Sequence, residues 1–526
     1  MPEQTDPRRY NSAVLLAIFF AALLAAHAPL LSLPYFWDEA GHYVPAARDL
    51  LLTGALIPRS TPSNAHPPLV MAVLALAWKL GGCSPLVTRT TMLLIAAFAL
   101  LGLFLLARSV TRTRVAIAAT VCTAIYPVFF MQSMLAQVDL AAAGLTFWGL
   151  RSYVEKRPWS AAAWFSAAAL AKETAILAPL ALFAGAMLLC FLLPRFAQGS
   201  HLSQRENWTR PAALLFPVVP LALWYLYHYE RTGFVFGNPE FFRYNVQATL
   251  QPLRILLALG LRLWQTLGYL NLYVLTLAAL AAMWLPPVKD GQQQRSRIDP
   301  RIQLQFLFVI AAYVISMAVI GGAVLARYML PAVPLVIIIL VSTLHRRMTA
   351  WHWVISMVVI AFGTALFINP PYGLSIEDNL ACRDYIQLHE DAEHFLASRY
   401  PNARVLTAWP ASDEVTRPYL GYVNQPLRTF RIEDFTLEQV MSAAEIRGFD
   451  VALVFSTKYE PPPSILDRSK TWTRWKTEFF GYHRDVPPAA AAALLGGRIV
   501  YERHRSGQWV AIIEMPSSRD LPSNAM

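Results

Sequence analysis

The chain has 526 residues, of which 56% are hydrophobic and only 15% are charged, and its formal net charge is +11. A mean hydropathy of +0.40 and several apolar runs near the ~20 residues that cross a bilayer indicate a polytopic α-helical membrane protein. The positive charge does not indicate nucleic-acid binding, because Lys and Arg lie in short loop clusters of the kind that the positive-inside rule produces.

The first apolar run, near residues 13–33, has some features of a signal peptide. It follows Arg8-Arg9 and contains Ala26-His27-Ala28. Pro29 would follow the cleavage point, which disfavours cleavage, and the apolar character continues to Leu33. We therefore expect an uncleaved first span with its N-terminus in the cytoplasm.

The first outer loop, expected at residues 34–85, carries two adjacent carboxylates, Asp38 and Glu39, followed by Tyr43 and His66. Acidic side chains at a membrane boundary are costly, so the pair predicts a functional site. A structural interpretation stays open beside it, because Asp38 could cap the helix that follows and Glu39 would be favoured by the helix dipole.

Basic clusters set the expected topology, and they lie at residues 8–9, 108–114, 156–157, 195–210, 289–301 and 346–347. If all are cytoplasmic, an even number of crossings separates consecutive clusters. The apolar stretch 159–193, of roughly 35 residues, would be about 52 Å long as one helix, against a hydrocarbon core of about 30 Å. It must therefore turn back, and its only charges, Lys172-Glu173, mark the outer turn.

The same reasoning divides residues 254–287 into an interfacial segment carrying Arg254 and Arg262 and a span that begins at about Tyr269. The apolar run 69–80 is too short to span and is expected along the interface. The pattern predicts about eleven spans. They are expected near residues 13–33, 86–107, 115–134, 139–153, 159–171, 174–193, 211–229, 268–287, 302–321, 328–344 and 350–368.

The composition changes after Asn369-Pro370-Pro371, which predicts a membrane domain at 1–369 and a soluble α/β domain at 370–526. In the second part, charged helix-like segments alternate with β-like runs at 403–407, 451–455, 498–501 and 509–514. With eleven crossings from a cytoplasmic start, the soluble domain is expected outside.

The remaining membrane-boundary charges gather on the outer side. Asp139 is expected at the turn between the third and fourth spans, Lys172 and Glu173 at the next outer turn, and Arg327 at the start of the tenth span. Each also has a structural interpretation: a helix cap for Asp139, interfacial anchoring for Lys172 and Arg327, and a loop role for His66. Glu173 is expected to pair with Lys172.

The cysteines Cys83, Cys122, Cys190 and Cys382 show no CxxC pair and no metal-ligand spacing. Cys122 and Cys190 lie in apolar runs and are expected to be small core residues. A bridge between Cys83 and Cys382 stays open, although nothing in the sequence argues for it.

Five short segments with polar or charged residues follow one another along the chain. In order they are Trp37-Asp38-Glu39 with Tyr43, His66-Pro67-Pro68-Leu69, Val138-Asp139, Ala171-Lys172-Glu173 and Arg327-Tyr328-Met329-Leu330-Pro331. In this order they resemble the pattern of the GT-C glycosyltransferases of the protein O-mannosyltransferase superfamily, which includes the bacterial lipid A aminoarabinose transferases. The resemblance covers about residues 10–370. It implies a GT-C type membrane domain, an acidic base in the first outer loop and a polyprenyl-phosphate sugar as donor.

The residues fit that chemistry. The leaving group of a polyprenyl-phosphate sugar is an ionised phosphate, so one carboxylate base is enough, and Asp38 is our candidate. A single displacement by an acceptor hydroxyl or amine would invert the anomeric centre. Glu39 and Asp139 are expected to hold the acceptor or to orient neighbouring cations. Tyr43, His66 and Glu173 are assigned to the acceptor side.

Charge on the departing phosphate would be stabilised by fixed cations, and Lys172 and Arg327 with Tyr328 are the candidates. A divalent metal is compatible with Asp38, Asp139 and His66 as ligands, but the number of acids does not require one. No Gly-rich phosphate loop or Asp-x-Asp motif is present, which favours a lipid-borne donor over a nucleotide sugar.

The expected partners are a polyprenyl-phosphate-linked sugar, a lipid, glycan or protein acceptor, and membrane lipids, with no nucleic acid. The expected location is the bacterial cytoplasmic membrane. Two other functions are alternatives: a transporter or flippase for a lipid-linked glycan, and a non-catalytic assembly factor. A transporter predicts ionisable residues near the bilayer midplane and two repeated halves, and a factor without activity need not keep the Asp38-Glu39 pair.

Overall fold

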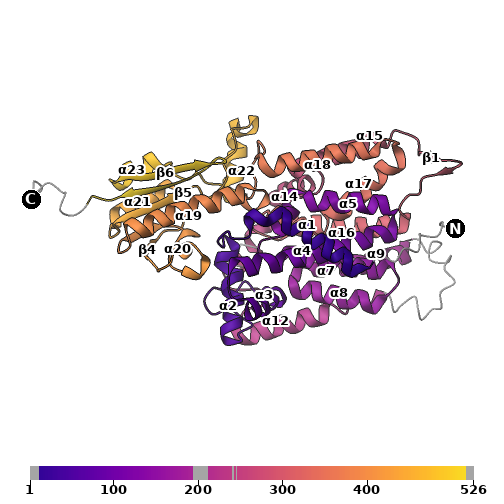
Figure 1. Cartoon of the computed structure of the whole chain (residues 1–526), viewed down its shortest axis with the longest axis horizontal. Coiled ribbons are helices and arrows are strands. Elements are labelled where there is room, and N and C mark those ends of the chain that lie inside the picture. The colour runs from indigo at the N-terminus through magenta and orange to yellow at the C-terminus, as the bar shows by residue number, and fades with distance from the viewer. Residues whose placement is uncertain (1–10, 193–210, 240–241, 244–245, 517–526) are drawn as a thin grey trace, which may run out of the picture.

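The computed structural model describes residues 11–192, 211–239, 242–243 and 246–516. A bundle of helices occupies one end of the molecule and a small β-sheet with its own helices occupies the other (Figure 1). The predicted basic clusters at 8–9 and 195–210 lie outside the described residues, as does the side chain of Cys190.

The helices of the bundle follow the predicted spans closely. Within the described ranges they are α1 (Ser12–His27), α2 (Val44–Thr53), α3 (Leu69–Gly81), α4 (Pro85–Val110), α5 (Thr113–Ile125), α6 (Pro127–Gln132), α7 (Asp139–Val154), α8 (Pro158–Ala171), α9 (Leu177–Leu192), α12 (Val218–Thr232), α14 (Pro252–Leu267), α15 (Leu272–Ala282), α16 (Pro300–Val319), α17 (Val333–Arg347) and α18 (Trp351–Phe367). A short hairpin of β1 (Lys289–Asp290) and β2 (Gln293–Gln294) precedes α16.

Local sequence explains where these helices begin and end. Proline opens α4, α8, α14 and α16, at a position where the missing N–H costs no helical hydrogen bond. Before α4, the Ser84 hydroxyl also accepts a hydrogen bond from the Val87 amide at 3.4 Å. Gly54, with φ 70°, ends α2 in the left-handed conformation that glycine adopts without a steric cost.

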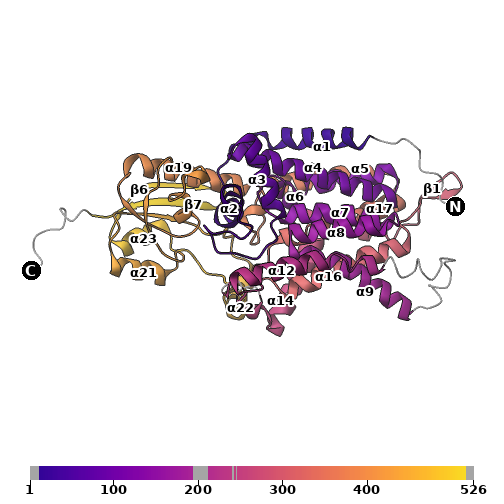
Figure 2. The same ribbon diagram turned by 90° about the horizontal axis from the view of Figure 1, so that it is seen from below.

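The helices α1, α4, α7 and α8 are stacked in this order, with α1 on the outside of the bundle (Figure 2). Helix α4 packs against α1, α5 and α7, and α7 packs in turn against α8. Close approach depends on small residues, because a Cβ placed on Gly144 of α7 would lie 2.5 Å from the Cβ of Ala99 on α4.

The predicted number of about eleven spans is not confirmed. By length and composition, the described residues include five helical stretches able to cross a membrane, namely Ser12–Leu30, Pro85–Val110, Pro211–Thr232, Pro252–Ala282 and Pro300–Val319. Each remaining predicted span also contains a helix, but a shorter or less apolar one.

The C-terminal part is a mixed five-stranded sheet, which confirms the expected α/β class. Its strands are β3 (Arg404–Thr407), β4 (Arg428–Arg431), β5 (Val451–Phe455), β6 (Arg498–Arg505) and β7 (Gln508–Glu514), in the order β4-β3-β5-β7-β6. Strand β3 pairs in parallel with β4 and β5, whereas β7 pairs antiparallel with β5 and β6. The central strand β5 is buried along its whole length, as expected for a strand covered on both faces.

Helices cover both faces of this sheet. Helix α19 (Ala381–Arg399) lies on one face, and α21 (Leu437–Ile446) and α23 (Pro488–Leu495) lie on the other (Figure 2). The short α20 (Ala411–Glu414) follows β3, and α22 (Lys470–Phe480) lies near α14 of the bundle, with the Arg254 guanidinium 5.9 Å from the Phe480 ring centroid.

The sheet part is joined to the segment between α1 and α3. The Tyr35 amide donates to the Leu420 carbonyl at 3.0 Å, and the Arg48 guanidinium lies 4.6 Å from the ring centroid of Tyr419. These contacts fix the loop that carries Asp38, so the two parts of the chain position one site together.

The structure also locates the two arginines of the expected interfacial segment and two of the cysteines. Arg254 and Arg262 of the expected interfacial segment are both buried in the protein, and they donate to backbone carbonyls of the segment after α16, including Gly321 at 2.7 Å and Leu325 at 2.7 Å. Backbone carbonyls left without helical partners in that segment attract the two guanidinium groups inward. The open question of a disulfide is also answered, because Cys83 is exposed, Cys382 is buried and both are free thiols.

Candidate active site

A cavity of about 810 Å³ lies where helix ends of the bundle, the first loop and the sheet part meet. The predicted site residues that line it are Asp38, Tyr43, His66, Lys172, Glu173, Arg327 and Tyr328. Asp139 and Glu39 lie behind its wall. The fold therefore gathers residues that are up to 290 positions apart in the sequence.

Asp38 stands at the start of a π-helical turn, Glu39–Tyr43, that leads into α2. The preceding Trp37 adopts φ 54°, an uncommon conformation for a bulky residue, and its ring packs edge-on against Trp409 at 4.8 Å. The Asp38 carboxylate is 23% exposed and accepts a hydrogen bond from Arg327. Asp38 is thus held in place and still faces the cavity.

Arg327 is surrounded by carboxylates. It lies in the short 3-10 helix Ala326–Met329, is 3% exposed, and donates to both Asp38 and Glu377. Its Nε lies 3.5 Å from Oδ2 of Asp139. A buried guanidinium is stable only with such partners, and its planar fork suits recognition of a further oxyanion.

Lys172 follows α8 directly and points towards the same centre. Its Nζ donates to Oδ1 of Asp139, the first residue of α7, at 2.5 Å. The ammonium also lies 4.1 Å from the ring centroid of Tyr328. Asp139 therefore bridges the two cations of the site.

Glu173 does not pair with Lys172, and that expectation is wrong. Its Oε2 lies 2.7 Å from Nδ1 of His66 instead. The backbone at Lys172 is extended, with φ −152° and ψ 131°, so the two consecutive side chains point to opposite sides. Tyr43 stacks on the other side of His66, with ring centroids 6.0 Å apart.

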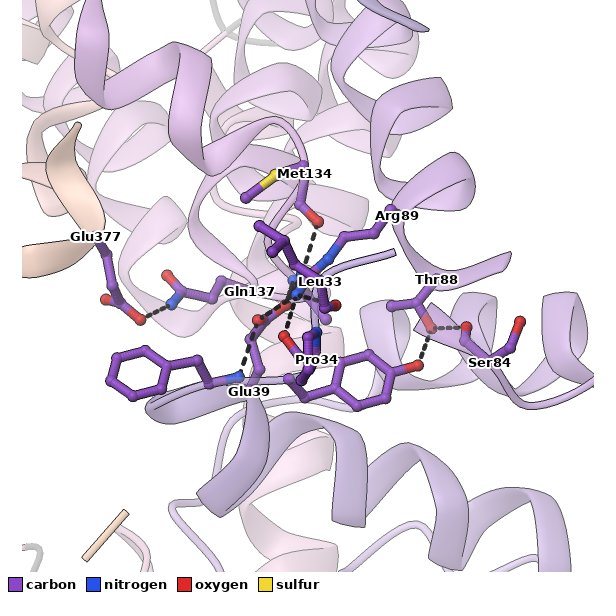
Figure 3. A network of polar contacts seen from close by, with 12 residues as sticks. Leu33, Pro34, Glu39, Ser84, Thr88, Arg89, Met134, Gln137 and Glu377 are labelled. Atoms are coloured by element: carbon purple, nitrogen blue, oxygen red, sulfur yellow. Dashed lines mark hydrogen bonds and ion pairs between the residues drawn. The ribbon is translucent and has the colours of Figure 1, made fainter. Parts of the chain in front are cut away.

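Glu39 is an anchor of the first loop (Figure 3). Its carboxylate is fully buried and receives two hydrogen bonds from Arg89 of α4 and one from the Ala136 amide at 2.5 Å. The Arg89 guanidinium also donates to the carbonyls of Pro34 at 3.0 Å and Met134 at 3.1 Å. The pair therefore ties the loop to the bundle.

Sequence reasoning missed Arg89 and Glu377. Arg89 could have been noticed as a charge near the start of the apolar α4. Glu377 carried no signal, because it lies beyond the predicted boundary of the membrane domain. It lines the cavity, and Gln137 Nε2 donates to it at 2.5 Å. Burial raises the pKa of Glu377 to about 8, although the Arg327 guanidinium opposes this rise.

The rest of the cavity wall has two distinct characters. One side is apolar and aromatic, and it consists of Tyr225, Phe236, Phe242, Val246, Met317, Ile320 and Leu325. The sheet part supplies Trp409, Thr457 and Lys458. The cavity thus combines charged side chains with an apolar set of lining residues from the bundle and a polar set from the sheet part.

The predicted metal ligands do not form a ligand cluster. Asp38 and Asp139 contact Arg327 and Lys172, and His66 contacts Glu173. Among the described residues, a group of three His, Cys, Asp or Glu donors within mutual reach occurs elsewhere, in the sheet part.

Comparison with known proteins agrees with this architecture. Residues 65–225 match the family described as dolichyl-phosphate-mannose-protein mannosyltransferase. The solved structure of ArnT from Cupriavidus metallidurans bound to undecaprenyl phosphate is 14% identical, with a TM-score of 0.53, and the match covers 98% of this chain and 100% of that one. The apo state of the same protein is 13% identical, with a TM-score of 0.54, over 95% and 98% of the two chains. No curated protein matches the sequence.

These matches confirm the resemblance to the GT-C glycosyltransferases. At such low identity the structural likeness shows the fold alone. The family match includes His66, Asp139, Lys172 and Glu173, whereas Asp38 and Arg327 lie outside it.

Proposed function

We propose that this protein is an integral membrane glycosyltransferase that moves a sugar from a polyprenyl-phosphate donor to an acceptor on the outer side of the cytoplasmic membrane. The observation that carries the proposal is one cavity lined both by a partly exposed carboxylate, Asp38, and by two buried cations, Lys172 and Arg327. A base and an anion-binding pair at one centre are what this transfer requires.

Asp38 acts as the base. It accepts the proton of the acceptor hydroxyl or amine while the acceptor attacks the anomeric carbon, and the bond from that carbon to the phosphate oxygen breaks. The leaving phosphate is an anion without protonation, so no general acid is needed. One displacement at the carbon inverts its configuration.

Lys172 and Arg327 receive the donor phosphate. Negative charge on the bridging oxygen grows as the bond breaks, and cations fixed in a site away from bulk water stabilise that charge more than exposed ones would. The ArnT structure with the same fold holds undecaprenyl phosphate. In the present chain the apolar wall formed by residues such as Phe236 and Met317 is suited to a polyprenyl chain.

The acceptor enters from the side of the sheet part. Lys458 and Thr457 follow strand β5 and line the cavity there, and Trp409 closes over the Asp38 turn. His66 and Glu173 contact each other and line the same cavity, and they hold the polar groups of sugar or acceptor.

The test is Asp38→Asn in purified, reconstituted protein with a polyprenyl-phosphate sugar. We expect the transfer rate to fall by about 10²-fold or more, the usual scale for loss of a general base, while donor binding persists. Asp391→Asn, on the surface of the sheet part, is the matched control and should leave the rate unchanged. Near-normal transfer by a folded Asp38→Asn protein would reassign the base, with Asp139 the next candidate.

A further inference from the structure

A second cluster of ionisable side chains lies in the sheet part. His389 and Glu393 are one turn apart on α19, and Glu414 ends α20. All three side chains are fully buried. The Nδ1 atom of His389 lies 2.7 Å from Oε2 of Glu414 and 3.8 Å from Oε1 of Glu393, and one ligand atom from each residue lies within 4.8 Å of the others.

The cluster is not satisfied by the protein alone. With both carboxyls ionised, neither oxygen of Glu393 has a hydrogen-bond donor among the described residues, and Oε1 of Glu414 also has none. Two adjacent buried carboxyls are stable only if a cation lies between them or if one of them is protonated.

We propose that His389, Glu393 and Glu414 bind a divalent transition-metal ion of the Zn²⁺ type. Imidazole nitrogen and carboxylate oxygen are zinc ligands, at about 2.0–2.2 Å from the metal. Ligand atoms of a tetrahedral zinc site are therefore about 3.4 Å apart, and the two measured separations from His389 Nδ1 fall on either side of this value. A His ligand disfavours Mg²⁺ and Ca²⁺, which prefer oxygen donors.

The site lies directly behind the first loop. The Phe36 ring packs edge-on against His389, with centroids 5.5 Å apart, and against Tyr385 at 5.0 Å. Phe36 is two residues before Asp38. A metal that fixes α19 to α20 therefore also stiffens the surface on which the loop rests. This inference does not depend on the proposed reaction.

The test measures metal content and thermal stability of the full-length protein, purified in detergent with an affinity tag that contains no histidine. We expect about one zinc ion per chain by elemental mass spectrometry, the stoichiometry of a single site. After removal of metal by EDTA, the Tm should fall by several degrees, and Zn²⁺ but not Mg²⁺ should restore it.

Glu393→Gln and His389→Gln should lose both the bound zinc and the Zn²⁺-dependent rise in Tm. His504→Gln is the matched control, because His504 pairs with Glu502 on the exposed strand β6 and should keep both. If the wild-type protein binds no zinc and its Tm responds to neither EDTA nor Zn²⁺, the carboxyls share a proton and the proposal is wrong. The zinc content and the Tm of the wild-type protein are measured without any variant, so they decide the question even if a variant does not fold.

Discussion

At the scale of single residues, the kinetic constants of variants show whether Lys172 and Arg327 bind the lipid donor or the acceptor. Both are buried and meet at Asp139, so the site already holds cations in place before any ligand arrives. Lys172→Ala should lower kcat/KM by about 10²-fold, with a higher KM for the lipid donor and a lower kcat, because the phosphate charge grows in the transition state. Arg327→Lys should act in the same direction, since lysine lacks the planar fork.

Lys458→Ala provides the matched comparison, because this lysine lines the cavity from the sheet part. It should raise the KM for the acceptor and leave donor binding intact. The opposite pattern, with Lys172→Ala affecting the acceptor alone, would move the donor phosphate to the other side of the cavity.

The sequence predicts that Glu39 belongs to the catalytic residues. Its buried contacts with Arg89 predict instead that its loss lowers the stability of the protein. Breaking one partner of the fully buried Glu39–Arg89 pair leaves an uncompensated charge, so Glu39→Gln or Arg89→Met should each destabilise the protein by about 3–5 kcal/mol. Thermal unfolding in detergent measures this change, and Arg503→Gln, which breaks an exposed pair, should have little effect.

Replacing both partners, as Glu39→Leu with Arg89→Leu, should recover part of the loss because no buried charge remains unpaired. An unchanged Tm for Glu39→Gln combined with lost transfer would instead return Glu39 to the reaction.

The sequence singled out residues that line the cavity, but it did not predict how these residues pair. Asp38, His66, Lys172 and Arg327 were found because charged groups at a membrane boundary are costly and stand out. Their partners depend on side-chain direction at individual turns, such as the extended backbone at Lys172. Glu377 was not predicted, since it enters the cavity from a segment whose position only the tertiary fold determines.

At the scale of elements, helix packing in the bundle rests on glycine at defined contacts. Gly144→Ala would place a methyl group 2.5 Å from the Cβ and 3.0 Å from the Cα of Ala99, and backbone cannot yield cheaply. We expect a loss of about 1–3 kcal/mol, the range for overpacking, seen as a lower Tm. Gly363→Ala on α18 is the control, because no atom lies within 4 Å of its added Cβ. Equal Tm values for the two variants would mean that α4 and α7 separate freely.

Apolar runs and prolines predicted most helices, and β-like runs predicted β3, β5, β6 and β7. Strand β4 was missed because its sequence, Arg-Thr-Phe-Arg, is short, polar and at the sheet edge. Apolar runs do not determine the number of membrane crossings, because helices such as α5 and α8 are shorter than the ~20 residues of a full span. The depth of such a short helix in the membrane depends on the helices that pack against it.

At the scale of the whole molecule, the site and the described arginine clusters of the short loops lie at opposite ends of the bundle. Asp139 begins α7 and Lys172 follows α8, so the ends of these helices that adjoin the cavity face the sheet part. At the far end, near the β1–β2 hairpin, Arg112 contacts Asp290 at 3.2 Å and Arg295 donates to the Met348 carbonyl at 3.1 Å (Figure 1). Clustered arginines at one end of a bundle favour a cytoplasmic location for that end.

This polarity predicts which side of the membrane each end faces. In a cysteine-free background, Ser398→Cys places an exposed thiol on the sheet part, and Gln292→Cys places one at the hairpin tip. An impermeant maleimide should label Ser398→Cys in intact cells, and it should label Gln292→Cys only after the membrane is opened. Since both positions are exposed, a difference between them reports the side of the membrane and not local burial. The reverse pattern would place the cavity towards the cytoplasm, where a nucleotide-sugar donor would be available, and would overturn the outward-facing site even if Asp38 remained the base.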